Sequence, residues 1–351
     1  MAETVFEKLA AALDRLPNGF PRTDSGVEIR ILKKIFSPEE AALACHLTGT
    51  PASVDAIAGR IGQPASDVSK RLFKMARRGL VWLEKQNGKP GFRLAPFIVG
   101  IYEAQMDLMD HEFAHLMQYY FADGGTAGLM RLQPALQRVV PAHASVKSEW
   151  VLPYDDVRTI LLEAKSFHVN DCICRVQQGL VGHKCEFPVD VCLSFSDQER
   201  PLRPGDISQA EALALLDRTE EIGLVHTVSN VKKGVGYICN CCGCCCGILS
   251  GITKLGLQES VACANYYAVI DPEFCANCGN CIERCQVHAI SEGETYSVVD
   301  KDRCIGCGLC VTGCPNDVAR LERKADAEMI HPPEDFAAWE HERLRNRGLA
   351  D

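Results

Sequence analysis

The chain has no long apolar run, and no basic segment followed by an apolar one at its amino terminus. A helix that crosses a bilayer needs about 20 mostly apolar residues, and a secretory leader needs that basic-then-apolar order. We therefore expect a cytoplasmic protein without a membrane span. The 351 residues are 47% apolar and 24% charged, which excludes a small disulfide scaffold and indicates two or three domains with their own cores.

Two common site motifs are incomplete. Gly234-Val235-Gly236 lacks the third glycine and the following helix of a dinucleotide fingerprint, so we predict no nucleotide site. The run His111-Glu112-Phe113-Ala114-His115 matches the short zinc-protease pattern, but Phe121 stands where a third ligand is expected, and no suitably placed glutamate follows. We interpret both histidines as ordinary helix residues, and the sequence names no catalytic residue.

Cysteine, by contrast, is abundant, with 20 residues in the chain. Such density in a reducing compartment indicates metal ligation rather than disulfides. Exposed clusters and thiolates are sensitive to oxygen. We therefore expect an anaerobic setting.

Eight cysteines form two runs with the same spacing, C-x2-C-x2-C-x3-C. The first run is Cys275, Cys278, Cys281 and Cys285, and the second is Cys304, Cys307, Cys310 and Cys314. Val269-Ile270-Asp271 and Val298-Val299-Asp300 precede the two runs at the same 29-residue displacement, which indicates an internal duplication. A pair of zinc knuckles is the alternative, because C-x-x-C pairs also bind zinc.

These runs, with Pro315 after the second, resemble the bacterial dicluster ferredoxins over residues 265–324. The resemblance implies two [4Fe-4S] clusters, with the fourth cysteine of each run serving the other cluster. The implied ligand sets are Cys275, Cys278, Cys281 and Cys314 for one cluster, and Cys304, Cys307, Cys310 and Cys285 for the other. One position departs from the family, since Gln286 follows Cys285 where proline is usual.

The middle of the chain holds a second group of cysteines. Apart from Cys45 and the eight above, eleven remain: Cys172, Cys174, Cys185, Cys192, Cys239, Cys241, Cys242, Cys244, Cys245, Cys246 and Cys263. Adjacent side chains point in different directions, so the six cysteines within residues 239–246 cannot all bind one cube.

Three of these central cysteines, Cys239, Cys242 and Cys245, repeat the C-x-x-C-x-x-C spacing, and Gly243 and Gly247 allow a tight loop. The fourth ligand is expected from the earlier segment: the candidates are Cys172, Cys174, Cys185 and Cys192. We predict one or two additional iron-sulfur clusters. Buried cysteines that act only as small apolar residues are the alternative.

Residues 37–95 follow a short amino-terminal helix and lead-in at 1–36. The sequence predicts helices from Ser37 to about residue 47, from 53 to 61 and from 66 to 78, because capping residues begin them and glycines end the last two. Strands at 80–83 and 92–94 flank the turn residues Asn87-Gly88. Three helices and a hairpin resemble a winged-helix domain.

The third of these helices has a basic face. Its residues are Lys70, Arg71, Lys74, Arg77 and Arg78. From Arg60 to Arg93 nine basic residues face two acidic ones, although the whole chain carries a net charge of −9. This face suits DNA phosphates, or an acidic partner protein; DNA is the less favoured partner, because we find no residues that would read bases.

The sequence thus predicts a multidomain α+β protein: a winged helix, a helical cysteine-rich domain at 96–264, the dicluster ferredoxin fold, and a charged tail at 325–351. The central helices are expected at 96–122, 155–167 and 208–222, and a helix in the tail at 334–347. The tail is expected to cover the ferredoxin unit or a partner subunit.

This arrangement resembles a group of anaerobic iron-sulfur proteins described as ferredoxin-domain proteins. The resemblance implies electron transfer, either as a carrier or as an electron-transfer subunit, with a redox partner protein and without a general base or nucleophile. Two alternatives stay open. One is an oxidoreductase, an iron-sulfur reductase acting at the central cluster, and the other is a redox-sensing winged-helix regulator that binds DNA. A homodimer is compatible with all three.

Overall fold

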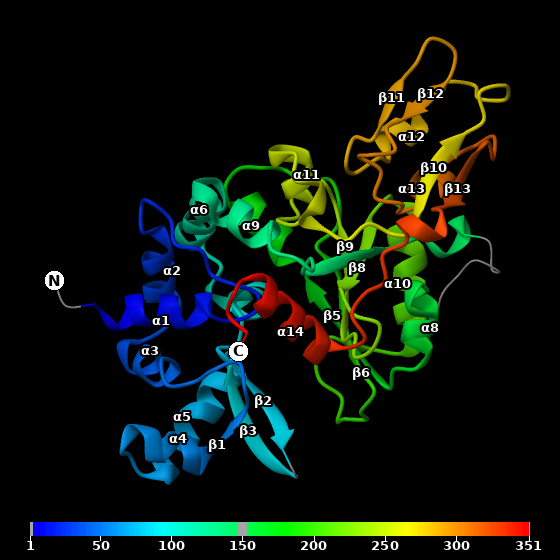
Figure 1. The fold of residues 1–351 in the computed structure, drawn as a ribbon. Coiled ribbons are helices and arrows are strands. Elements are labelled where there is room, and N and C mark those ends of the chain that lie inside the picture. The colour runs from blue at the N-terminus through cyan, green and yellow to red at the C-terminus, as the bar shows by residue number, and fades with distance from the viewer. Residues whose placement is uncertain (1–2, 87, 147–152, 351) are drawn as a thin grey trace. The chain divides into compact units, whose positions relative to one another are not determined.

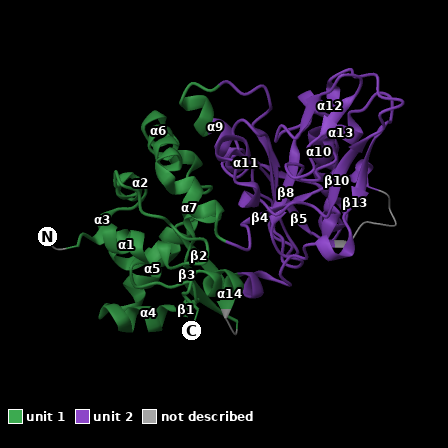
Figure 2. Cartoon of the chain, turned by 45° about the horizontal axis from the view of Figure 1, so that its top comes forward, with its two compact units in different colours: residues 1–132, 177–183, 340–351 green, residues 133–176, 184–339 purple. Residues whose placement is uncertain are grey.

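The structure is a computed structural model that describes residues 3–86, 88–146 and 153–350. The chain divides into two compact units (Figures 1 and 2). Unit 1 contains residues 1–132, 177–183 and 340–351, and unit 2 contains residues 133–176 and 184–339. Among the described residues, no helix is both long enough and apolar enough to cross a membrane.

Unit 1 begins with five helices and a small antiparallel sheet whose strand order is β1-β3-β2. The helices are α1 (Val5–Asp14), α2 (Val27–Ile35), α3 (Pro38–Ala44), α4 (Val54–Ile61) and α5 (Ala65–Arg77), and the strands are β1 (Ala52–Ser53), β2 (Val81–Gln86) and β3 (Lys89–Leu94). The predicted capping box begins α3, with Ser37 Oγ accepting from Glu40 N at 3.2 Å. Helix α5 buries Val68, Leu72 and Met75, which lie on one side of the helix. The turn residue Asn87 lies outside the described residues.

The single helix predicted for residues 96–122 is wrong. The structure has a turn at η1 (Phe97–Ile101), a second at η2 (Met106–Leu108), helix α6 (His111–Tyr120), a kink at η3 (Phe121–Gly125) and helix α7 (Thr126–Met130). Ile98, Val99 and Gly100 have non-helical dihedral angles. The apolar residues here fill a core without helical periodicity: the rings of Phe97 and Phe20 lie 4.3 Å apart.

Unit 2 is built around a six-stranded antiparallel sheet with the order β4-β8-β9-β6-β5-β7. The strands are β4 (Gln137–Val140), β5 (Ser166–Asp171), β6 (Asp190–Ser196), β7 (Asp206–Ile207), β8 (Val225–Ser229) and β9 (Tyr237–Cys241). The predicted helical central domain is therefore corrected to a mixed one. Its short strands carry cysteines and polar residues, which hid the apolar alternation that marks a half-buried strand.

Two helices cover one face of this sheet (Figure 1). They are α8 (Val157–Leu162) and α10 (Gln209–Glu221). Leu161 and Leu216 pack there with Leu193 of β6 and Ile238 of β9. Because side chains alternate along a strand, the neighbours of Leu193 and Ile238 point to the opposite face. Those neighbours are Cys192 and Cys239.

The helix predicted at 155–167 ends early, and its last residues belong to β5. Helix α10 has the predicted extent and begins with a capping box formed by Ser208 and Glu211. Outside the sheet, unit 2 also contains α11 (Leu249–Leu255) and four short turns: η4 (His143–Ser145), η6 (Pro153–Asp155), η7 (Gln258–Ser260) and η8 (Asp326–Glu328).

A small duplicated region follows in unit 2. Strand β10 (Tyr266–Ile270) pairs with β13 (Ala319–Arg323), and β11 (Ile290–Glu292) pairs with β12 (Ser297–Val299). Helices α12 (Asn280–Glu283) and α13 (Leu309–Thr312) follow the two cysteine loops. Each half is therefore a strand, a cysteine loop and a single helical turn, as the sequence predicts.

The last helix, α14 (Phe336–Asn346), carries a fully buried arginine. Arg343 donates to three backbone carbonyls of unit 1: Pro17 O at 2.8 Å, Leu132 O at 2.5 Å and Leu129 O at 3.0 Å. The predicted tail helix thus exists, and this residue anchors it on unit 1.

Arg343→Met is expected to lower the free energy of unfolding by roughly 3 kcal/mol, because three backbone carbonyls, two of them in buried hydrogen bonds, lose a charged donor. The measurement is the urea midpoint followed by circular dichroism. Arg345→Met is the matched control, because Arg345 is exposed on the same helix. Equal midpoints for the two variants would contradict the anchoring role.

Candidate metal centres

The eight cysteines of the duplicated region line two small cavities. One is lined by Cys275, Cys278, Cys281 and Cys314, and the other by Cys285, Cys304, Cys307 and Cys310. Each cavity therefore gathers three cysteines from one run and the fourth from the other run. This interleaving is the ligand arrangement that the sequence predicts, and it fits two four-iron cubes.

Backbone amides near the cysteines donate hydrogen bonds to two of the sulfurs. Ala289 N donates to Cys285 Sγ at 3.1 Å, and Asn277 N donates to Cys275 Sγ at 3.4 Å. Gly308, which follows Cys307, has φ +75°, and a Cβ there would lie 2.0 Å from Ser145 Oγ, so this position of the cysteine loop requires glycine. Amide donors of this kind stabilise the charged sulfur of a ligand, and hydrogen bonds to sulfur tune the potential of a bound cluster.

Burial controls the protonation of several of these thiols. It raises the pKa of Cys307 to about 12, and it also raises the pKa of Cys285 and Cys310. Such thiols stay protonated at neutral pH unless a cation replaces the proton. Metal binding at this site therefore releases protons.

A third group of cysteines meets in the centre of unit 2. Its members are Cys185, Cys242, Cys244 and Cys245, and their sulfurs all lie within 4.8 Å of one another. Cys185 Sγ is 3.9 Å from Cys242 Sγ and 3.7 Å from Cys244 Sγ, and Cys244 Sγ is 3.6 Å from Cys245 Sγ. We call this group the four-cysteine centre. Among the described residues it is the one group of three or more potential ligands that meets this distance.

The electrostatics of the four-cysteine centre favour a thiolate. Hydrogen bonding from Cys245 and the nearby Arg175 guanidinium lower the pKa of Cys242 to about 5, against the opposing effect of burial. Burial and the negative charge of Cys242 raise the pKa of Cys244 to about 12. Four sulfurs at this spacing form a donor set that suits zinc or an iron-sulfur cluster.

The structure regroups the central cysteines that the sequence predicts as ligands. Cys242 and Cys245 come together with Cys185, which is one of the four candidates for the remaining ligand. Cys239, however, interacts with Cys192, and Cys172 interacts with Cys174 and Cys192. None of these four joins the group of sulfurs within 4.8 Å, although Cys172, Cys174 and Cys192 pack in the same core cluster as Cys242 and Cys245. The sequence missed Cys244, because we expected adjacent cysteines to diverge.

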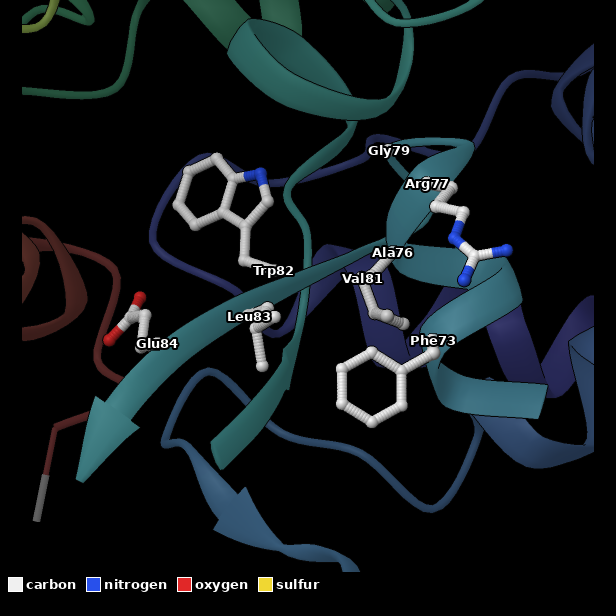
Figure 3. Close-up of a pocket in the computed structure, with 8 residues that line it drawn as sticks. All are labelled: Phe73, Ala76, Arg77, Gly79, Val81, Trp82, Leu83 and Glu84. Atoms are coloured by element: carbon white, nitrogen blue, oxygen red, sulfur yellow. The ribbon is translucent and has the colours of Figure 1, made fainter. Parts of the chain in front are cut away.

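The basic residues of α5 are partly used inside unit 1. Arg78 Nη1 forms an ion pair with Glu40 at 2.6 Å, and Arg71 donates to Glu39 O and Gln63 Oε1, each at 2.8 Å. Beside α5, an open hollow is lined by Phe73, Ala76, Arg77, Gly79, Val81, Trp82, Leu83 and Glu84 (Figure 3). Arg77 and Glu84 are the two lining residues with ionisable side chains, so the hollow does not bring together a group of catalytic residues.

The two histidines of α6 pair with each other. Their Nε2 atoms lie 3.3 Å apart, and Glu112 binds Lys34 at 2.7 Å. No third ligand joins them within the described part of the chain.

Residues 268–321 match the family model of the 4Fe-4S dicluster domain. Neither the curated proteins nor the solved structures gave a match to the chain. Unit 2 thus contains a dicluster domain, which implies two [4Fe-4S] clusters. No comparison supports a winged helix at residues 37–95, and that identity stays a prediction.

Proposed function

We propose that the protein is an electron carrier or an electron-transfer subunit, in which the dicluster domain exchanges electrons with the four-cysteine centre. One observation carries this proposal: Gln286, which follows the cluster ligand Cys285, binds the loop of the four-cysteine centre, and Arg284, which precedes Cys285, binds the end of α10 in the same unit. The bound clusters would supply reversible one-electron exchange with a redox partner protein. The side chains hold them, bury them and tune their potentials.

Gln286 makes the first of these contacts. Its Oε1 accepts from Gly243 N at 2.9 Å, and its Nε2 donates to Gly223 O at 2.9 Å. Gly243 lies between Cys242 and Cys244. A Cβ at Gly243 would lie 1.9 Å from Gln286 O, so only glycine permits this approach. The residue that departs from the ferredoxin pattern therefore contacts the four-cysteine centre, and its amide side chain replaces the usual proline.

Arg284 makes the second contact. Its Nη1 donates to Glu221 O at 2.7 Å and its Nη2 to Glu220 O at 2.8 Å, at the carboxyl end of α10. A cation is favourable there, because the last carbonyls of a helix have no helical partner. Its Nε also donates to Leu309 O at 2.8 Å, within the dicluster domain. Arg284 and Gln286 thus hold Cys285 close to the central sheet.

The other cluster site is open on its outer side. Cys278 is the exposed member of its ligand set, and Phe274, which precedes the ligand Cys275 in the same loop, is 68% exposed. An exposed aromatic residue beside an exposed ligand suits a docking partner. We propose that electrons enter or leave there and that the four-cysteine centre is the inner end of the route.

Gln286→Leu is expected to slow the reduction of the four-cysteine centre without slowing that of the dicluster clusters. The substitution removes the hydrogen bonds of Gln286 with Gly243 N and Gly223 O, which are worth about 2 kcal/mol together. The equilibrium constant for holding Cys285 against the Gly243 loop is therefore expected to fall about 30-fold. The test mixes the anaerobic holoprotein with a reduced ferredoxin and follows each centre by freeze-quench electron paramagnetic resonance.

Gln198→Leu is the matched control, because Gln198 is exposed. Unchanged kinetics in Gln286→Leu, or a four-cysteine centre that never changes oxidation state, would refute the proposed route.

A further inference from the structure

A second thiol cluster lies beside the four-cysteine centre in unit 2. Its members are Cys172, Cys174, Cys192, Cys239, Cys241 and Cys246, and we call them the six-thiol ring. Cys172 interacts directly with Cys174 and Cys192. Cys239 interacts with Cys192 and with Cys241. Cys246 interacts with Cys241, and it lies close enough to Cys174 to act on it electrostatically.

The sheet explains why these residues meet. Leu193 of β6 pairs with Ile238 of β9 on the face that α8 and α10 cover. The next residues, Cys192 and Cys239, therefore share the other face with Cys241. Cys172 follows β5 directly, and Cys174 lies in the first turn of α9 (Ile173–Leu180). Five of the six positions thus come from three adjacent strands and the helix that follows one of them.

Buried polar groups contact the sulfurs of the ring. Gln137 Nε2 donates to Cys239 Sγ at 3.7 Å. Thr227 Oγ1 donates to Gln137 Oε1 at 2.9 Å, which orients this amide, and it also lies 3.5 Å from Cys241 Sγ. Gln137 is 3% exposed and Thr227 is fully buried. An amide that donates to sulfur is typical of the surroundings of a metal-bound thiolate. Cysteines that merely fill a core do not need such donors.

A buried cation needs negative charge at the same place. Arg175 is 3% exposed, and no carboxylate of the described residues forms a salt bridge with it. Its Nη1 donates to Pro188 O at 3.0 Å and its Nη2 to Asn240 O at 2.8 Å, whereas its Nε has no hydrogen-bond partner. Its guanidinium interacts electrostatically with Cys172 and Cys241 of the ring, and with Cys242 of the four-cysteine centre. A buried guanidinium is costly unless it is paired. The two backbone carbonyls satisfy part of its hydrogen bonding but carry no net charge, so cluster-bound, anionic sulfur on both sides would supply the missing pairing.

We propose that the six-thiol ring binds an iron-sulfur cluster of its own, separate from the four-cysteine centre. Six thiols exceed the four that one cube needs, so the ring accommodates a cube or a larger cluster. Each ligating thiol gives up its proton when it binds iron. The inference goes beyond the proposed electron transfer and does not depend on it, since it concerns which cysteines hold iron.

The test counts iron, acid-labile sulfide and zinc in the anaerobically purified full chain. Cys192→Ala/Cys241→Ala is expected to lose about four or more irons per chain relative to the unmodified protein, because two ring ligands are absent. The spectra of the dicluster domain and of the four-cysteine centre are expected to persist. Cys45→Ser is the control, since Cys45 lies in unit 1 with its sulfur 3.6 Å from Val5 O.

Three outcomes would overturn the proposal: full iron content in the double variant, zinc at the ring, or simultaneous loss of the four-cysteine spectrum, which would mean one shared centre. These outcomes differ from a failure of electron transfer, in which the iron count stays as expected and only the kinetics disagree.

Gln137→Met provides a test that leaves all ligands in place. It removes the donor to Cys239 Sγ at similar volume, so the midpoint potential of one centre is expected to fall while the others stay constant, because hydrogen bonds to sulfur help set the potential. Unchanged potentials in a folded Gln137→Met protein would count against a cluster at the ring.

Discussion

Removal of the iron is expected to unfold the dicluster domain and to leave residues 1–132 folded. The domain has helices of four residues, strands of three to five, and a buried apolar set of few large side chains, including Ile270, Val287, Ile305 and Leu309. So small a core seldom supports a fold without metals or disulfides. Its folding free energy is therefore mostly the free energy of binding the clusters, which for metal-coupled folding reaches about 10 kcal/mol.

Hydrogen exchange measured by mass spectrometry tests this expectation, before and after oxidation and chelation without oxygen. Peptides from residues 266–323 are expected to lose protection by at least about 1,000-fold, since that factor corresponds to only part of the binding free energy. Peptides from α1 to α5 serve as the internal control. Their core contains Leu9, Leu13, Ile31 and Leu32, all fully buried and without any metal ligand. Retained protection at 266–323 would show that the domain folds without its clusters.

Replacement of two ligands of the four-cysteine centre has the second large expected effect. Cys242→Ala/Cys245→Ala removes both fully buried members of the group, including the sulfur held as a thiolate near Arg175. The variant is expected to lose about four irons per chain and the corresponding paramagnetic species, because a cube held by two cysteines is not retained. Iron and sulfide analysis with electron paramagnetic resonance measures both losses.

The control for this variant is again Cys45→Ser, which is expected to keep its full iron content. The dicluster spectra are expected to be unchanged, since none of their ligands is altered. If the double variant keeps all of its iron, the four-cysteine centre holds no cluster. If it loses zinc instead, the centre is structural and the proposed electron route ends at the dicluster domain.

Local sequence patterns determined several helices in both units. Helices α3 and α10 begin where serine and glutamate form capping boxes, because those contacts involve residues only three positions apart. The buried side of α5 follows from its helical periodicity. The long helix from Pro96 and the helical centre were wrong for the opposite reason. There the chain conformation depends on packing against distant residues such as Phe20, which no local pattern reports.

The sequence by itself determined the dicluster domain, because its ligands lie on tight loops whose spacing is fixed by the cube they surround. Only the tertiary structure decided how the central cysteines divide. Cys185 reaches Cys242 across 57 residues, and Cys192 meets Cys239 through the register of β6 and β9. The role of Gln286 was also decided by the tertiary structure, because in the sequence this residue is only a departure from the family pattern. Gln286 and Gly243 are 43 residues apart, and their contact depends on how the intervening chain folds, which no local sequence pattern reports.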